Sequence, residues 1–176
     1  MLKRCSIIFL TFCISACGFH LRGSVALPEE LDYIAINSQQ SASPIQPYLT
    51  RALQARNVVI TSDTSQANLI LNLISEQYTR TAGSISADTN TRQYNIVYSV
   101  VFDILSPRGD VILGAQQVRV TRSTNVDTNQ LLGSTYEEDT IRNEMRREAS
   151  TQILYRLSSF KTVQALRDLE EMESSK

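Results

Sequence analysis

The sequence predicts an α+β protein, a two-layer sandwich of two amphipathic helices packed on a mostly antiparallel four-stranded sheet. Three long segments in the middle of the chain alternate apolar and polar residues, which is typical of strands with one buried face. One segment before them and one after them repeat apolar residues at helical spacing. Each amphipathic helix needs an apolar surface, and the sheet supplies one, so a two-layer arrangement follows.

A short strand and a helix are the first predicted elements. Residues 33–37, YIAIN, are expected to form the strand, and a polar loop follows. Ser43 favours a helix N-cap and Pro44 the first helical position. The apolar stripe of this helix consists of Ile45, Leu49, Ala52 and Leu53. Asn57 is expected to end the helix.

The three long strands form the centre of the predicted sheet. The first carries Leu69, Leu71 and Leu73 on one face. The second alternates more clearly, with Tyr94, Ile96, Tyr98, Val100, Phe102 and Ile104. A turn over residues 106–110, SPRGD, leads into the third strand, from Val111 to about Thr121. The segment from Thr79 to Thr91 has almost no large aliphatic residue and is predicted to be a long, mobile hairpin tip.

The last predicted element is a long helix. Ser134 and Glu137 have the spacing of a capping box, so the helix is expected to start at Ser134. Its apolar stripe consists of Ile141, Met145, Ala149, Ile153 and Leu157. The pattern then weakens, so residues 161–176 are predicted to be a frayed or disordered tail, and residues 31–160 a single α+β domain.

The N-terminal residues resemble an export signal. Lys3 and Arg4 precede an apolar run over residues 6–14 that is about half the length a bilayer-spanning helix needs. Residues 1–16 are therefore expected to be removed as a signal peptide, and residues 17–30 to form a leash. Removal would shift the formal charge from −1 to −3. This acidic balance argues against a nucleic-acid partner.

Cys17 would then be the first residue of the mature chain and its only cysteine. Residues 14–17, ISAC, resemble the bacterial lipobox, in which the thiol receives a diacylglycerol and the new amino terminus an acyl chain. Several acyl chains make an anchor lasting, because each buried methylene contributes about 0.8 kcal/mol. Gly18, rather than Asp, at the next position favours the outer membrane. The alternative is an accidental cysteine near the cleavage site.

Candidate catalytic residues are scarce. The only histidine, His20, lies three residues from the proposed anchor, and general acid–base chemistry near neutral pH relies most often on His. No glycine-rich phosphate loop is present. Without further thiols or imidazoles, a zinc site would need mainly carboxylates. We therefore expect no enzymatic activity, no metal and no cofactor other than the covalent lipid on Cys17.

Arginines are the strongest candidates for binding. Arg80 and Arg92 bracket the predicted loop, and Arg119 and Arg122 lie near the end of the third long strand. Arg is suited to bidentate contacts with phosphate or carboxylate. We take Arg80, Arg92 and Arg122 as candidate contacts, and dispersed surface charge as the alternative.

Residues 17–22, CGFHLR, resemble the mature amino terminus of the lipopolysaccharide-assembly lipoprotein family, LptE, and the order of elements over about 17–160 fits that family's fold. The resemblance implies a non-enzymatic outer-membrane lipoprotein that plugs and supports an LptD-like β-barrel and binds lipopolysaccharide. When the chain is aligned on Tyr94 and Glu137, Ala87 and Ser134 stand where other members have basic contact residues. Arg92 or Arg80 would have to replace the first of these.

Two other functions remain open from the residues alone. One is a different accessory lipoprotein, such as a secretin pilotin. The other is a periplasmic lipoprotein hydrolase that uses paired carboxylates, because acidic residues brought together by folding cannot be recognised from their spacing in the chain.

Overall fold

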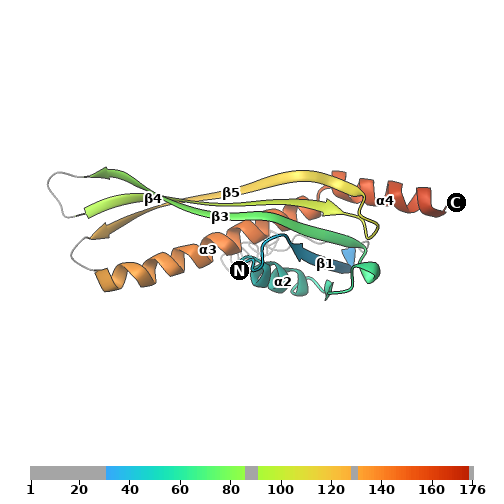
Figure 1. The fold of residues 1–176 in the computed structure, drawn as a ribbon, viewed down its shortest axis with the longest axis horizontal. Helices are drawn as coiled ribbons and strands as arrows, with labels where there is room; N and C mark the ends of the chain where they lie inside the picture. Colours follow the sequence, from blue (N-terminus) through green and yellow to red (C-terminus); the bar gives the residue numbers. More distant parts are fainter. Residues whose placement is uncertain (1–30, 86–90, 128–130, 175–176) are drawn as a thin grey trace, which may run out of the picture.

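The computed structural model describes residues 31–85, 91–127 and 131–174. The short elements come first along the described chain and the long ones follow, and Figure 1 shows a long, narrow body built from the long ones. In chain order they are β1 (Tyr33–Ser38), α2 (Gln46–Gln54), β2 (Val59–Thr61), the 3₁₀ helix η2 (Thr64–Gln66), β3 (Leu69–Ile85), β4 (Thr91–Leu105), β5 (Val111–Asp127), α3 (Leu131–Leu157) and α4 (Phe160–Ser174).

The strands form one mixed five-stranded sheet in the order β2-β1-β3-β4-β5. The short strand β1 is parallel to both β2 and β3, while β3, β4 and β5 are antiparallel. The α+β class is confirmed, but the expected four strands are five in the described part of the chain. The missed strand, β2, has only three residues, which is too short to show the alternation that identifies a strand.

The hairpin of β3 and β4 is longer than expected. β3 continues to Ile85 and β4 begins at Thr91, so most of the predicted loop over residues 79–91 is paired strand. Thr79 pairs with Val97 and Thr81 with Asn95. The absence of aliphatic residues was misleading because Thr is itself favoured in strands. β5 likewise runs to Asp127 rather than to about Thr121.

The apolar core lies between one face of the sheet and the helices. The alternating face of β4, from Ile96 to Ile104, is completely or almost completely buried. Leu49 and Leu53 of α2 and Met145, Ala149 and Ile153 of α3 are likewise 0% exposed. Burying one large aliphatic side chain contributes about 1.5–3 kcal/mol. Both predicted helical stripes are therefore confirmed as core faces.

Both of these helices begin at other positions than predicted. α2 begins at Gln46, with Ile45 in the N-cap position, so Ser43 is not the cap. Its hydroxyl instead donates to Glu76. α3 begins at Leu131, so Ser134 lies within the helix. The capping-box spacing was misleading because a Ser and a Glu three residues apart also occur inside helices.

The predicted tail over residues 161–176 is wrong over most of its length, because α4 extends from Phe160 to Ser174. Thr162, Val163 and Leu166 are buried, and Leu166 belongs to the main core cluster. The apolar pattern of α4 is short and is followed by acidic residues, which explains why it resembled a solvated end. The described chain thus has three α-helices where two were expected.

Within the described ranges, no helix combines the length and the apolar character needed to cross a bilayer.

Candidate binding site between the sheet and α3

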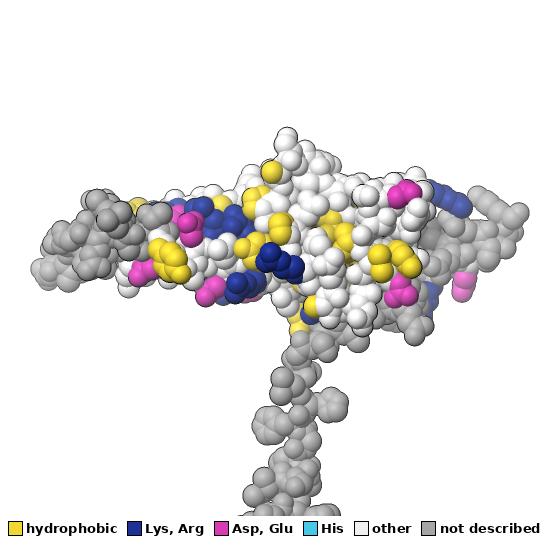
Figure 2. Space-filling model, turned by 90° about the horizontal axis from the view of Figure 1, so that it is seen from below, with side chains coloured by type: hydrophobic (Ala, Val, Ile, Leu, Met, Phe, Trp, Pro, Cys, Tyr) yellow, Lys and Arg dark blue, Asp and Glu magenta, His cyan; other side chains and the backbone are white. Residues whose placement is uncertain are grey.

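Toward the hairpin end of the molecule, the apolar core gives way to charged and aromatic side chains between the sheet and α3. We call this region the charged layer. Its members are Glu76, Arg80, Arg122, Glu138, Arg142, Arg146 and Glu148, together with the rings of Tyr78, Tyr94 and Tyr98. Seen from below, basic and acidic side chains intermix over the left half of the molecule (Figure 2).

A β-bulge orients the members of the charged layer that lie on β3. Leu73 pairs with Phe102, but the register shifts before Ser75 pairs with Val101. Beyond this shift, Glu76, Tyr78 and Arg80 pair with buried residues of β4 and share their face. Simple alternation from Leu73 would have directed Ser75, Gln77 and Thr79 toward α3 instead.

Arg80 and Arg122 lie in one row across the sheet. Arg80 pairs with Ile96, and Ile96 pairs with Arg122, so the two arginines stand on either side of a fully buried isoleucine. The Nη1 atom of Arg80 lies 2.7 Å from Oε2 of Glu138. Its guanidinium carbon lies 3.7 Å from the centre of the Tyr94 ring. Arg122 forms an ion pair with Glu148.

Glu138 connects α3 to the sheet through two donors on β3 and also accepts from a third donor on α3 itself. It accepts from Arg80, from Nη2 of Arg142 at 3.0 Å, and from the Tyr78 hydroxyl at 3.1 Å. The Arg142 guanidinium also stacks 4.3 Å from the centre of the Tyr78 ring. Partial burial raises the pKa of Tyr78, so its hydroxyl remains a protonated donor at neutral pH.

Glu76 forms the buried centre of the charged layer, with only 7% of its side chain exposed. Its carboxylate accepts from the Tyr98 hydroxyl at 2.6 Å, the Ser43 hydroxyl at 3.0 Å and the Ile45 N–H at 3.2 Å. The Nε atom of Arg146 lies 3.8 Å away, beyond hydrogen-bond distance. Burial, followed by the hydrogen bond to Glu76, raises the pKa of Tyr98 well above its usual range.

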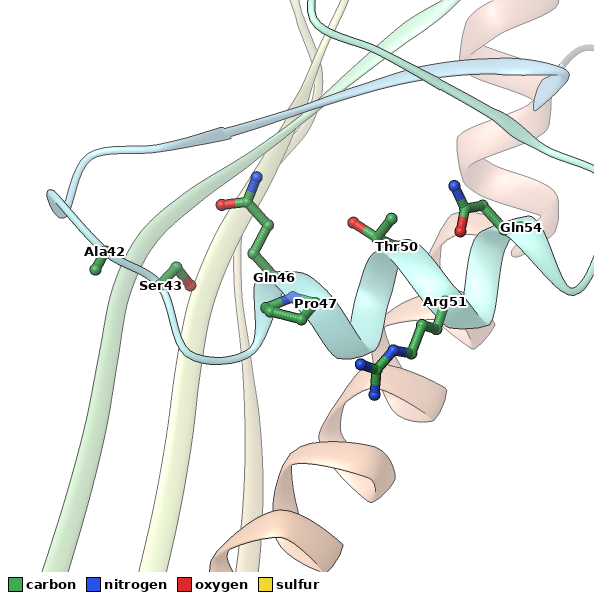
Figure 3. A pocket seen from close by; sticks show the side chains of 7 residues that line it. All are labelled: Ala42, Ser43, Gln46, Pro47, Thr50, Arg51 and Gln54. Carbon is green, nitrogen blue, oxygen red and sulfur yellow. The ribbon is translucent and has the colours of Figure 1, made fainter.

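A hollow of about 390 Å³ adjoins this buried carboxylate. It is lined by Gln40, Ala42, Pro44, Glu76, Tyr78, Tyr98 and Arg146. A larger hollow of about 550 Å³ lies along α2 and the loop before it, lined by Ala42, Ser43, Gln46, Pro47, Thr50, Arg51 and Gln54. Figure 3 shows that Arg51 is the only charged side chain among these. The residues that line the larger hollow therefore include no pair of oppositely charged side chains. The charged layer, which has several such pairs, is the better candidate site for a charged ligand.

The structure brings two of the three candidate contact arginines into one site. Arg80 and Arg122 both lie in the charged layer. Arg92 lies farther out on β4, where its backbone pairs with Ile85 and Val126. Arg119 pairs with Ser99 on the opposite face of the sheet. Cys17, His20, Arg22 and Ala87 lie outside the described residues, and Ser134 falls within α3.

Sequence reasoning missed the acidic partners of these arginines. The last predicted helix was recognised from its apolar stripe and its capping-box spacing, and Glu138, Arg142 and Arg146 belong to neither. The spacing of Glu138 and Arg142, four residues apart on a helix, was the available signal. Nothing in the sequence indicated the pairs that join α3 to the strands, which are 58 and 26 residues apart.

Among the residues that the structure describes, no group of three or more His, Cys, Asp or Glu side chains is arranged to hold a metal ion. Four arginines of the charged layer, at positions 80, 122, 142 and 146, face the carboxylates at positions 76, 138, 139 and 148. The site is thus suited to charged ligands that can replace one of these internal partners.

Residues 31–157 match the family model described as LptE, lipopolysaccharide-assembly. The chain is 28% identical over 144 residues to the LPS-assembly lipoprotein LptE of Pectobacterium atrosepticum, covering 81% of this chain and 77% of that one. It is also 28% identical over 143 residues to the protein of the same name from Photorhabdus laumondii, with 81% and 78% covered.

Solved structures share the fold. The solution structure of an uncharacterized lipoprotein B from Nitrosomonas europaea matches with a TM-score of 0.68 at 24% identity, covering 82% of this chain and 93% of that one. The crystal structure of the rare lipoprotein B from Shewanella oneidensis matches with a TM-score of 0.58 at 20% identity, covering 71% and 92%.

Proposed function

Because the chain belongs to the LptE family of lipopolysaccharide-assembly proteins, we propose that it is an outer-membrane lipoprotein that plugs an LptD-like β-barrel. In this role it supports assembly of the barrel and assists insertion of lipopolysaccharide into the outer leaflet. Family membership itself gives the chain a non-enzymatic role in lipopolysaccharide transport. The secretin-pilotin and hydrolase alternatives receive no support from the family match.

The row formed by Arg80, Ile96 and Arg122 is the observation that best supports the proposed contact with lipopolysaccharide. Lipopolysaccharide bears phosphate groups, and Arg binds phosphate through paired hydrogen bonds. The side chains of Arg80 and Arg122 are 33% and 42% exposed, so a ligand can reach them. Arg92, on the same hairpin, is the third proposed contact.

The face of β3, β4 and β5 that points away from α3 supports the proposal of a β-barrel partner. Its described residues between positions 75 and 81, 95 and 101, and 117 and 123 are almost all uncharged, and Arg119 is the exception. The interior of a large outer-membrane barrel is polar. A long, narrow body (Figure 1) with a polar, weakly charged face suits insertion into such a lumen.

Cys17 is the proposed lipidation site, carrying a diacylglycerol and an N-acyl chain. The segment over residues 17–30 would then connect a lipid in the inner leaflet to the domain that begins at Leu31. Several acyl chains make attachment to the membrane lasting.

A triple variant tests lipopolysaccharide contact. Replacing Arg80, Arg92 and Arg122 together by alanine is expected to reduce lipopolysaccharide retained on the purified protein about tenfold or more, since each charged hydrogen-bonded contact contributes roughly 1 kcal/mol or more. Arg119→Ala, which removes an exposed arginine from the opposite face, is the matched control and should retain the ligand. Unchanged retention in the triple variant would show that these arginines are surface charge.

A further inference from the structure

The first part of α3 is held against the sheet mainly by charges, and the partly buried Ile141 adds an apolar contact with the core. Of the described side chains from Tyr136 to Glu144, none is buried, and Tyr136 is 79% exposed. The first buried apolar side chain along α3 in the described part is Met145, which is 0% exposed. Glu138 and Arg142 provide the contacts to β3 in this segment.

The two arginines proposed to bind lipopolysaccharide already have carboxylate partners on this helix. Arg80 pairs with Glu138, whose side chain is 22% exposed, and Arg122 with Glu148, at 39%. Ion pairs that water can reach contribute little net free energy. A phosphate group offers Arg the same bidentate geometry with more negative charge. Exchange of one anion for the other therefore needs little energy.

We infer that Glu138 and Glu148 occupy the arginine sites in the ligand-free protein and that phosphate groups of lipopolysaccharide displace them, freeing the segment Tyr136–Glu144 of α3 from β3. The inference rests on the proposed function, because that function supplies the ligand. The two carboxylates thus act as internal competitors of the ligand.

The two exchanges differ in their structural consequence. Glu148 lies beyond Met145, on the part of α3 held by buried Ala149, Ile153 and Leu157, so its replacement needs only a side-chain rotation. Glu138 lies on the segment without buried side chains, and its replacement removes the acceptor of Arg80 and Tyr78. Release of the segment also breaks the packing of Ile141 against the core and the hydrogen bond from the Tyr48 hydroxyl to Asn143. It is expected to stop at Met145, the first fully buried side chain.

Charge-neutral variants of the two carboxylates test the competition. Lipopolysaccharide binding is measured on the full chain purified in detergent, for Glu138→Gln and Glu148→Gln. Each variant is expected to bind about 1.4- to fivefold more tightly, since an ion pair that water can reach contributes about 0.2–1 kcal/mol. Glu144→Gln, on the same helix and exposed, is the matched control and should bind as the wild type does.

A parallel arm uses the same lipopolysaccharide with its lipid A phosphates removed. Neither variant should bind this probe more tightly than the wild type, because the freed arginines then lack their ligand. An equal gain with both probes would overturn phosphate exchange. So would unchanged or weaker binding of phosphorylated lipopolysaccharide by both Gln variants.

The arginine variants separate this inference from the proposed function. If the triple alanine variant loses lipopolysaccharide while the Gln variants gain nothing, the arginine contacts stand and the competition is wrong. If the triple variant also binds normally, the proposed contacts themselves fail.

Amide hydrogen exchange tests the freed segment separately. Adding lipopolysaccharide is expected to speed exchange of the amides of Tyr136–Glu144 and to leave those of residues 149–157 unchanged, because the latter carry the buried stripe. Unchanged or slower exchange of Tyr136–Glu144 at saturating ligand would show that α3 is not released.

Discussion

Glu76 is the residue at which four parts of the molecule meet. Its carboxylate lies on β3 and accepts from Ser43 and Ile45 before α2 and from Tyr98 on β4, with Arg146 of α3 close by. A carboxylate this buried is stable only when its acceptors are filled. Its role is therefore to fix the relative positions of the helices that flank the charged layer.

Tyr98→Phe tests this role. The substitution removes one donor from a buried carboxylate while keeping the ring, so we expect the free energy of unfolding to fall by about 1–3 kcal/mol. Urea unfolding followed by circular dichroism measures the change. Tyr155→Phe is the control, because Tyr155 is 56% exposed. This variant should unfold at the same urea concentration as the wild type. An equally small effect of both variants would contradict the role of Glu76.

The same variant predicts a difference in pH dependence. Burial and then Glu76 raise the pKa of Tyr98 above the ordinary value of about 10. Above that pH the unfolded chain releases the phenol proton while the folded protein keeps it, so the free energy of unfolding falls as the pH rises. From about pH 9 to about pH 11, this fall should be shallower for Tyr98→Phe, and equal slopes would argue against the raised pKa.

At the residue scale, the sequence supports the choice of arginines but not the identity of their partners. Arg80 and Arg122 could be chosen as candidates from the sequence because Arg side chains commonly bind anions. Their placement in one row depends on the bulge after Leu73, which reverses the facing of Glu76 and Arg80. A bulge shifts the phase of the alternation, but beyond Leu73 the residues that face α3 are Glu76, Tyr78 and Arg80 rather than aliphatic ones. The shift therefore could not be recognised from the apolar pattern.

At the scale of elements, α4 is the helix that sequence periodicity failed to identify. Its contact with the core is narrow, through Val163 and Leu166. The long strands show the same difficulty, because residues 79–84 of β3 are Thr, Arg, Ala, Gly and Ser and form no apolar face. In both cases, pairing or packing forms with few of the large aliphatic residues on which periodicity arguments depend.

Leu166→Ala tests whether α4 stabilises the domain. Leu166 is 4% exposed and packs in the main core cluster, so we expect the free energy of unfolding to fall by about 2–4 kcal/mol. Gln164→Ala, at an exposed position of the same helix, should change it by less than about 0.5 kcal/mol. Equal unfolding midpoints for the two variants would show that α4 adds nothing to stability.

At the scale of the whole molecule, the layered α+β class followed from the sequence because two helical stripes and an alternating strand face require one another. The parallel pairing of β1 with β2 and β3 did not follow, since short strands carry too few residues to specify a partner. The described body begins at residue 31, directly after the proposed leash over residues 17–30, and the leash is expected to connect it to the membrane.

Cys17→Ala tests the anchor. Without the thiol, the chain should no longer incorporate labelled palmitate and should keep its signal segment, because lipid attachment precedes cleavage at a lipobox. Cys13→Ala is the matched control, since Cys13 lies within the segment expected to be removed, and it should be labelled normally. Normal labelling of Cys17→Ala would show that the anchor lies elsewhere.

Recovery of the protein with its partner from detergent-solubilised outer membranes tests the central claim most directly. A tag placed after Lys176 leaves the proposed leash and the charged layer intact. We expect a large LptD-like β-barrel to co-purify in equal amount, together with lipopolysaccharide. Recovery of a secretin instead, or of the chain without any β-barrel, would contradict the account.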